Sequence, residues 1–340
     1  MNSKERYDLT TRNLAEVLTE DGLNKLIESK KAPVVYWGTA PTGKPHVGYF
    51  LPMLKVADLL NAGWQVKILL ADLHAALDNT PWEVLEKRYQ YYARVIPLMI
   101  KALGVKEVKN LKFVKGSDFQ LEKKYFEDLM KLSSYTSVKN AEKAGSEVVK
   151  QSDNPRLSGL IYPLMQVLDE EYLKVDAQLG GMDQRKIFVL ARESMSKLGY
   201  EPRIELINPL VPSLVSGGKM SASNEKSKID LLDTEKEIKQ KINDADCVAG
   251  DSDNGVMAFV KFVIMVIKQD ANEKFVVQRP EKYGGNLEYK NYEEVEKDFN
   301  DKKLHPLDLK NSIANEIVEL LKPIQKQRKE LEKLAKAGYS

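Results

Sequence analysis

Two features of the amino-acid order predict an α/β fold with a parallel sheet. Up to residue 233, apolar β-branched runs alternate with segments of helical periodicity. This alternation is typical of a parallel sheet covered by helices on both faces. After residue 233 the pattern is mainly helical. The 340 residues are enough for two domains, so we expect a sheet domain at 1–233 and a helical domain at 234–340.

The expected strands are short, apolar runs at 32–39, 66–73, 111–114, 172–177 and 204–207. Helical patterns lie between them at 47–61, 82–103, 121–132, 141–151, 157–169 and 184–198. In the second domain we expect helices at 235–245, 254–268, 291–300 and 306–336, with a loop at 278–285. Thr234 and Glu237 have the spacing of a capping box at the start of the first of these helices.

The composition excludes several classes of protein. A single cysteine, Cys247, rules out an intrachain disulfide and a cysteine-based zinc site. Pro and charged residues interrupt every apolar run before it reaches membrane-spanning length. The first ten residues mix acids and bases, unlike a signal peptide or a mitochondrial presequence. We therefore expect a cytoplasmic protein with no membrane partner. The net charge of +2 means that any RNA must bind to a local basic face.

The first motif is Pro-Thr-Gly-Lys-Pro-His-Val-Gly-Tyr at 41–49. A helix opening at His46 offers free N–H groups to phosphate, and Gly48 lets an adenine ring approach the backbone. Taken alone, His46 is better interpreted as a helix cap or a core histidine than as a residue of a phosphate site. The stretch from Gly38 to Lys44 also matches the first seven positions of a phosphate-binding P-loop. Pro45 stands where that loop needs a hydroxyl for Mg²⁺, so we disfavour the P-loop interpretation.

The second motif is Gly-Gly-Lys-Met-Ser-Ala-Ser at 217–223. Alone, Lys219 is one of many surface lysines and Met220 a residue that packs beneath a loop. Together with the first motif, it predicts a site that holds ATP for adenylate chemistry. In such a reaction, positioning and charge stabilisation supply most of the rate.

Polar residues also recur in the predicted helix at 157–169 and in the turn after it. Tyr162, Gln166 and Asp169 are spaced i, i+4 and i+7, which puts them on one helix face among apolar neighbours. They form either an internal hydrogen-bond network or the floor of a polar ligand pocket. In Gly180–Gln184, read as strand, tight turn and helix, Asp183 either binds a ribose hydroxyl pair or caps the helix.

With these motifs the sequence resembles the class I tyrosyl-tRNA synthetases of the archaeal and eukaryotic cytoplasmic type. The resemblance extends from Tyr36 to about Lys322, over YWGTAPTGKPHVGY, LLADLHAALDN, YPLMQVLDEEYLKVDAQLGGMDQRK, NPLVP, GKMSAS, RPEKYGGN and HPLDLKN. It implies a Rossmann-like catalytic domain, a helical anticodon-binding domain and a two-step ligation of tyrosine to tRNA(Tyr). ATP enters with Mg²⁺ as substrate, and no tightly bound cofactor or dedicated metal site is expected. The resemblance also implies a homodimer with an interface near 118–160.

The resemblance assigns roles to individual residues of this sequence. The catalytic set comprises His46, Gly48, Lys219, Ser221 and Ser223. The tyrosine pocket comprises Tyr36, Leu69, His74, Phe119, Gln120, Tyr162, Gln166, Asp169 and Gln184, with Tyr36 and Asp169 at the phenol hydroxyl. ATP contacts comprise Gly38, His46, Gly48, Gly181, Asp183, Lys219 and Met220. Contacts with tRNA comprise Arg185 and Lys186 at the acceptor stem and Tyr283, His305 and Asp308 at the anticodon.

Two positions depart from the family motifs, and three rival functions stay open. Tyr49 replaces the last residue of the HIGH signature, and Ala222 replaces the second lysine of KMSKS. The rivals are a tryptophanyl enzyme, a small-molecule adenylyltransferase and an RNA-binding paralogue without activity. A basic stretch between Lys322 and Lys336 is interpreted as a solvated helix face in preference to an RNA contact.

Overall fold

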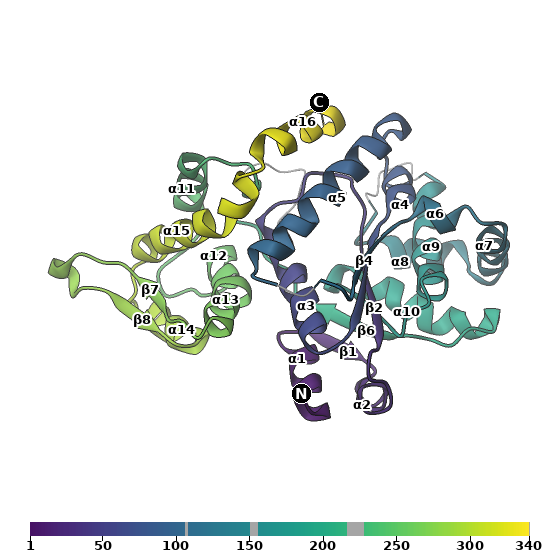
Figure 1. Cartoon of the computed structure of the whole chain (residues 1–340), viewed down its shortest axis with the longest axis horizontal. Coiled ribbons are helices and arrows are strands. Elements are labelled where there is room, and N and C mark those ends of the chain that lie inside the picture. The colour runs from purple at the N-terminus through teal and green to yellow at the C-terminus, as the bar shows by residue number, and fades with distance from the viewer. Residues whose placement is uncertain (106–107, 150–155, 216–227, 340) are drawn as a thin grey trace.

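The computed structural model describes residues 1–105, 108–149, 156–215 and 228–339. Its centre is a six-stranded sheet in the order β1-β6-β5-β2-β3-β4 (Figure 1). The strands are β1 (Glu16–Leu18), β2 (Val34–Thr39), β3 (Gln65–Leu70), β4 (Leu111–Lys115), β5 (Ala177–Gly181) and β6 (Ile204–Asn208). All neighbours are parallel except β1 and β6, which are antiparallel. The predicted α/β class is confirmed.

The connections between strands are helical. They are α3 (Phe50–Asn61), α4 (Asp72–Leu77), α5 (Leu85–Ala102), α6 (Ser117–Gln120), α7 (Lys123–Tyr135), α8 (Val138–Gly145), α9 (Ser158–Tyr172) and α10 (Arg185–Ser194). The sequence did not predict α1 (Ser3–Thr11), α2 (Glu20–Ser29), β1, α4 or α6. None of the described helices is both long and apolar enough to cross a membrane.

Side chains of β2 alternate between two separate cores. Val35 and Trp37 belong to a large apolar cluster with residues of α3 and α5. Tyr36, between them, faces the other side, with Leu69 of β3. Because successive strand residues point to opposite faces, one buried strand serves both cores.

The strand expected at 172–177 is misplaced. Helix α9 continues to Tyr172, and the strand is β5, Ala177–Gly181. Gly180 and Gly181 end the strand, the 3₁₀ turn Met182–Gln184 follows and α10 begins at Arg185, so the predicted order of strand, turn and helix is confirmed. A Cβ on Gly180 would lie 2.4 Å from Cζ of Phe188. Glycine is therefore needed for contact between α10 and β5, and not for a turn.

The C-terminal helical region, residues 234–339, follows the sheet. It contains α11 (Glu235–Asp244), α12 (Gly255–Phe259), α13 (Met265–Asp270), β7 (Phe275–Val277), β8 (Leu287–Tyr289), α14 (Tyr292–Asn300), α15 (Pro306–Gln325) and α16 (Arg328–Tyr339). Thr234 and Glu237 form the predicted capping box. A π-helical turn at Val260–Ile264 joins α12 to α13 where one helix was expected. The helix expected at 306–336 is divided into α15 and α16.

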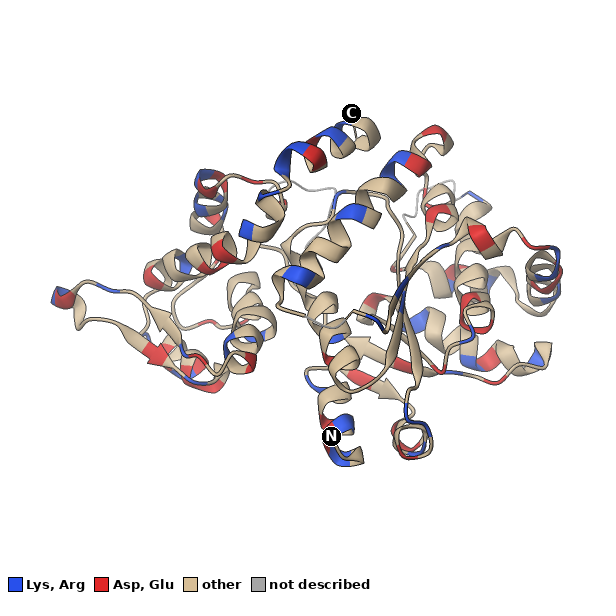
Figure 2. Ribbon diagram, in the orientation of Figure 1, with Lys and Arg blue, Asp and Glu red and all other residues tan. Residues whose placement is uncertain are grey.

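The helical region packs against the sheet region through α5. Helices α15 and α16 both contact α5, and the π-helical turn contacts α3. One apolar cluster contains Phe50 of α3, Tyr91 of α5 and Leu321 of α15. Charged residues are distributed over both regions (Figure 2), and Lys329, Lys333 and Lys336 of α16 are exposed to solvent.

Candidate active site

A cavity of about 690 Å³ lies at the carboxyl ends of β2 and β5. From β2, the chain proceeds to β3 and β4 on one side of the sheet and to β5 and β6 on the other. Ligands of open parallel sheets bind at such a reversal of strand order. The predicted residues that line the cavity are Tyr36, Gly38, His46, Gly48, Leu69, His74, Tyr162, Gln166, Asp169, Gly181, Asp183 and Gln184.

His46 begins a 3₁₀ turn, Val47–Tyr49, that continues into α3. Its Nδ1 accepts a hydrogen bond of 3.2 Å from the backbone N–H of Gly48. Burial, together with repulsion from Lys228, lowers the pKa of His46 to about 4. The ring is therefore neutral at physiological pH, and its proton lies on Nε2 because Nδ1 accepts. His46 does cap its turn, and it also lines the cavity.

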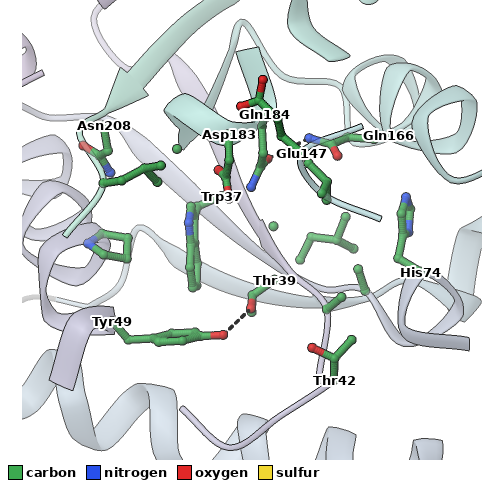
Figure 3. A pocket seen from close by; sticks show the side chains of 18 of the residues that line it. Trp37, Thr39, Thr42, Tyr49, His74, Glu147, Gln166, Asp183, Gln184 and Asn208 are labelled. Carbon is green, nitrogen blue, oxygen red and sulfur yellow. Dashed lines mark hydrogen bonds between the residues drawn. The ribbon is translucent and has the colours of Figure 1, made fainter. Parts of the chain in front are cut away.

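The side chain of Tyr49, the residue that departs from the HIGH signature, contacts Thr39 at the end of β2 and His46 itself. Its ring lies edge-on to His46, with 5.2 Å between ring centroids. Its hydroxyl is 3.4 Å from Oγ1 of Thr39 (Figure 3) and 3.2 Å from the hydroxyl of Tyr92. Tyr92 in turn donates to the carbonyl of Gly43 at 2.6 Å. The hydroxyl of Tyr49 is thus linked to the backbone of the first motif through Tyr92.

Ile229 and Asp230, which follow the second motif in the sequence, pair with the first motif. The N–H of Val47 donates to the carbonyl of Ile229 at 3.0 Å, and His46 forms an antiparallel bridge with Asp230. Lys44 and Asp230 form an ion pair of 2.8 Å. The assigned residues Lys219, Met220, Ser221 and Ser223 lie outside the described residues.

The deep end of the cavity contains the carboxyl group of Asp169, which is 1% exposed. Its Oδ1 accepts 2.8 Å from Nε2 of Gln120 and 2.9 Å from the hydroxyl of Tyr125. Its Oδ2 lies 3.7 Å from Nε2 of His74. Tyr36, also 1% exposed, donates weakly to the carbonyl of Gln166 at 3.5 Å.

Burial controls the protonation of this cluster. It raises the pKa of Asp169 to about 7, although the bonds from Gln120 and Tyr125 oppose the rise. Burial lowers the pKa of His74 to about 4. It also raises the pKa of Tyr36 well above its ordinary value. Near neutral pH the histidine and phenol are uncharged, and Asp169 is the group poised to gain or lose a proton.

Polar side chains from α9 and the start of α10 face the cavity from the opposite side to Tyr49 (Figure 3). Nε2 of Gln166 donates 2.8 Å to Oε1 of Gln184. The rings of Tyr162 and His74 meet edge to face, with 4.7 Å between centroids. Asp183 lies in the 3₁₀ turn Met182–Gln184, which has no side-chain cap, so the capping alternative for Asp183 is wrong.

The other assigned residues lie outside this cavity. Gln120 is buried behind Asp169, and Phe119 packs against Tyr125 with 5.8 Å between ring centroids. Arg185 pairs with Glu16 at 2.6 Å and Lys186 with Glu147 at 2.7 Å. In the helical region Tyr283 is 61% exposed. The cap of α15 is His305, whose Nδ1 accepts from the N–H of Leu307 at 3.2 Å, while Asp308 lies in the first turn.

Comparisons with known proteins agree with this arrangement. The family model described as tRNA synthetases class I (W and Y) matches residues 28–322. The cytoplasmic tyrosine–tRNA ligase of Gallus gallus is 52% identical over 99% of this chain, which spans 63% of that protein. The cytoplasmic tyrosine–tRNA ligase of Saccharomyces cerevisiae is 48% identical over 100% of this chain and 89% of its own length. The chain belongs to the class I tyrosyl-tRNA synthetases.

A solved structure from the same family has the same fold over its whole length. The tyrosyl-tRNA synthetase of Archaeoglobus fulgidus, complexed with L-tyrosine, superposes with a TM-score of 0.88 and is 38% identical. The match covers 96% of this chain and 100% of that protein. The likeness therefore includes the C-terminal helical region as well as the sheet.

Sequence reasoning missed Tyr125, which holds the carboxylate of this tyrosyl-tRNA synthetase site. Tyr125 is fully buried, and its hydroxyl also donates to the carbonyl of Met165 at 2.9 Å. A signal was present: Tyr125, Leu129 and Leu132 form the apolar stripe of α7. A hydroxyl on a buried stripe needs a partner, but the stripe does not indicate which residue that partner is.

We expect the pH dependence of stability to differ between the wild type and Asp169→Asn. The folded state keeps a proton on Asp169 up to about pH 7, whereas the unfolded chain releases it near pH 4. Between these values the folded state binds more protons, so wild-type stability falls as pH rises. We would measure the free energy of unfolding in urea at about pH 5 and about pH 8. Between these two values, the stability of Asp169→Asn relative to the wild type should rise by about 1–3 kcal/mol. A difference that is independent of pH would contradict the buried, neutral carboxyl group.

Proposed function

We propose that the chain is a tyrosine–tRNA ligase, which activates tyrosine with ATP and transfers the tyrosyl group to the 3′ end of tRNA(Tyr). Membership of the family supports this proposal, as do the names of its relatives. The observation that carries it is the deep end of the cavity, which closes on the hydroxyl of Tyr36 and the carboxyl group of Asp169. Polar groups at that depth suit an amino acid whose ring ends in a hydroxyl.

Tyrosine lies with its ring between Leu69 and His74 and its phenol at Tyr36 and Asp169. Gln120 and Tyr125 already bond to Oδ1 of Asp169, so the phenol donates to Oδ2. This new bond favours the ionised carboxylate and draws its pKa below the value of the empty site. Phe119 supports the pocket from behind. Tyr162, Gln166 and Gln184 surround the α-amino group at the mouth of the pocket.

ATP lies over the start of α3. The neutral His46 has a proton on Nε2 for a phosphate oxygen. The N–H groups of Val47 and Gly48 are not free as expected, because they donate to the carbonyl of Ile229 and to Nδ1 of His46. The start of α3 therefore contributes only the partial positive charge of its dipole. Gly38 and Gly48 leave room for the nucleotide, while Gly181 and Asp183 contact the ribose. The pyrophosphate is assigned to Lys219, Met220, Ser221 and Ser223, which lie outside the described residues. Mg²⁺ enters with ATP as part of the substrate.

The reaction has two steps, and neither uses a protein nucleophile. In the first step, the tyrosine carboxylate attacks the α-phosphate, pyrophosphate leaves and tyrosyl-adenylate forms. In the second, a terminal ribose hydroxyl of tRNA attacks the tyrosyl carbonyl and AMP leaves. The chain contributes orientation and stabilisation of the charge that develops on the phosphates, from His46, the start of α3 and Lys219.

The tRNA contacts both regions of the chain, in the cytoplasm. Arg185 and Lys186 meet the acceptor stem beside the cavity, exchanging their partners Glu16 and Glu147 for phosphate or base groups. Tyr283, His305 and Asp308 bind the anticodon. Tyr283 suits this role because its exposed ring is available to stack on an unpaired base.

Pyrophosphate exchange into ATP, measured with each amino acid separately, tests the proposed function. Exchange that depends on tyrosine is the expected result. Exchange that depends on tryptophan would indicate the tryptophanyl enzyme instead. Exchange that needs a different carboxylate would indicate the small-molecule adenylyltransferase. Absence of exchange with every amino acid would return the chain to the RNA-binding alternative.

We expect Tyr36→Phe and Asp169→Asn to reduce the preference for tyrosine over phenylalanine in this exchange. A site that bonds a hydroxyl rejects a ligand without one, because its own buried groups stay unpaired. Tyrosyl-tRNA synthetases are themselves the established example, at about 10⁵-fold, so this magnitude is the family's. Each variant should lose at least about tenfold of the preference. An unchanged ratio in both variants would remove these residues from the phenol end.

We further propose a homodimer through α7 and its flanks, within the predicted 118–160 segment. Tyr125, Leu129 and Leu132 of α7 face inward, but Phe126 and Met130 are 58% and 47% exposed. Other exposed apolar residues near them are Leu121, Tyr135, Val138 and Leu157. In Figure 1, α7 lies at the edge opposite the helical region. Exposed apolar residues on α7 and on the segments beside it in the sequence support an interface between two copies.

Phe126→Asp should halve the mass measured by sedimentation, because a buried unpaired carboxylate at an interface costs several kcal/mol. Val248→Asp is the matched control, since Val248 is 69% exposed but lies in the helical region. The control should keep the wild-type mass. Equal masses for the two variants and the wild type would place the interface elsewhere.

Tyr283→Ala and Asp308→Ala should reduce the preference for tRNA with the native anticodon over an anticodon-altered tRNA. Pyrophosphate exchange should stay at the wild-type rate, since it needs no tRNA. Because His305 and not Asp308 caps α15, Asp308→Ala should leave the melting temperature nearly unchanged. His305→Ala is the control for capping and should cost about 1 kcal/mol of stability. An unchanged preference in both variants would leave this region a structural role only.

A further inference from the structure

The N-terminal segment holds helix α3 at the end opposite the cavity. Nε of Arg6 donates 2.9 Å to the carbonyl of Ala62, directly after α3. Nζ of Lys55, within α3, donates 3.3 Å to the carbonyl of Leu9 and 3.2 Å to that of Thr10. Nε1 of Trp64 donates 3.0 Å to Oγ1 of Thr10. The helix that begins at the His46 turn is therefore fixed at its far end by residues 6–10.

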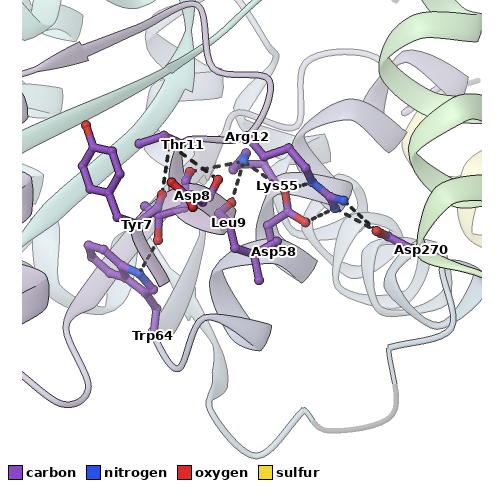
Figure 4. A network of polar contacts seen from close by, with 10 residues as sticks. Tyr7, Asp8, Leu9, Thr11, Arg12, Lys55, Asp58, Trp64 and Asp270 are labelled. Atoms are coloured by element: carbon purple, nitrogen blue, oxygen red, sulfur yellow. Dashed lines mark hydrogen bonds and ion pairs between the residues drawn. The ribbon is translucent and has the colours of Figure 1, made fainter. Parts of the chain in front are cut away.

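Arg12 joins this arrangement to the C-terminal helical region (Figure 4). Its guanidinium binds the carboxylate of Asp58 in α3 through Nε at 3.2 Å and also through Nη2. On its other side Nη1 and Nη2 donate 2.6 and 3.0 Å to the two carboxylate oxygens of Asp270. Asp270 is the last residue of α13. One planar guanidinium thus makes two-point contacts with both regions of the chain.

Charge balance explains why Asp270 is needed. Lys55 and Asp58 are 3% and 4% exposed and lie 2.9 Å apart. With Arg12, whose side chain is 24% exposed, they make two cations and one anion, and Asp270, whose side chain is 50% exposed, supplies the missing negative charge at the solvent side of the cluster. Burial lowers the pKa of Lys55, while Asp58 and Asp270 oppose that shift. The contact between regions therefore completes a charge cluster and is more than an isolated surface ion pair.

We propose that Arg12 and Asp270 form a latch that positions the C-terminal helical region relative to helix α3, and so relative to the active site. The proposal rests on the proposed function. A tRNA bound by the helical region at its anticodon end must reach the cavity with its 3′ end. The latch sets the orientation of two parts of the chain relative to each other. One is the helical region, which binds the anticodon end of the tRNA. The other is α3, which binds ATP for the reaction at the 3′ end. Arg12 and Asp270 are positioning residues, since neither touches the substrates.

The decisive variant is Asp270→Asn, because it breaks the link between regions and leaves the Arg12–Asp58 pair intact. Glu273→Gln is the matched control: Glu273 is an exposed carboxylate just beyond α13 whose partner, Lys268, belongs to the same region. Each protein is assayed for tyrosine-dependent pyrophosphate exchange, aminoacylation of full-length tRNA(Tyr), and aminoacylation of an acceptor-stem minihelix. The minihelix lacks the anticodon arm, so the helical region cannot position it.

For Asp270→Asn we expect kcat/KM for full-length tRNA to fall about fivefold, equivalent to about 1 kcal/mol. Exchange and minihelix aminoacylation should stay at wild-type values. Asp270→Lys, which places a like charge against Arg12, should lower kcat/KM for full-length tRNA further. Asp270→Glu should restore part of the loss. The Glu273→Gln control should match the wild type in all three assays.

Two results would overturn the latch. The first is an equal kcat/KM of Asp270→Asn and Glu273→Gln for full-length tRNA. The second is a loss of kcat/KM in Asp270→Asn that is as large for the minihelix as for full-length tRNA. Amide hydrogen exchange decides the physical contact without any activity. Segments 3–12 and 265–270 should exchange faster in Asp270→Asn than in Glu273→Gln, and equal rates would also overturn it. Failure of the wild type to exchange pyrophosphate with tyrosine would instead contradict the proposed function, and hydrogen exchange would still decide the contact.

Discussion

The burial of β2 on both faces is the constraint on which the site depends. Parallel neighbours β3 and β5 take its backbone hydrogen bonds on either side. Its side chains alternate between the core shared with α3 and α5 and the core under Tyr36. Beyond Thr39 the chain must leave the sheet, and it leads within a few residues to His46. The proposed phenol-binding end and the proposed phosphate-binding end of the cavity are therefore set by one strand, and a change in packing on either face displaces both.

The deep end of the cavity is polar but holds little fixed charge, whereas Asp78, Glu147 and Asp183 line the rest of it. His46 and His74 are kept neutral by burial, and the Asp169 carboxyl titrates near neutrality. Keeping an acid in such a place costs folding free energy when it ionises. Hydrogen bonds from Gln120 and Tyr125 reduce this cost in part, and a ligand that donates a further hydrogen bond to the carboxyl group reduces it more. The residue that lowers the folding stability, Asp169, is therefore also the residue proposed to distinguish the ligand from its close analogues.

Long periodic segments were predictable from the sequence, and elements held by tertiary contacts were not. Helix α5 and strand β2 carry strong apolar patterns, and residues of the first motif line the cavity. Helix α1 escaped prediction because only Thr10 of it is buried, so it has no apolar stripe. Strand β5 was placed too early because Gly180 is required by the approach of Phe188, which no local pattern records. Tyr125 was missed for a similar reason: its bond to Asp169 joins α7 to α9 and has no local signature.

Contacts between α1 and α3 explain why the residues of α1 are polar. Helix α3 leaves unpaired carbonyls at its far end, and the guanidinium of Arg6 meets one of them there. A cation at the C-terminus of a helix and an anion at its N-terminus are both favourable to the helix dipole. Arg6 supplies the first permanently, and the proposed ATP phosphates supply the second when they bind beside His46. A segment of exposed polar residues can thus be ordered by the same helix that presents the nucleotide site, and Arg12 extends that order to the helical region.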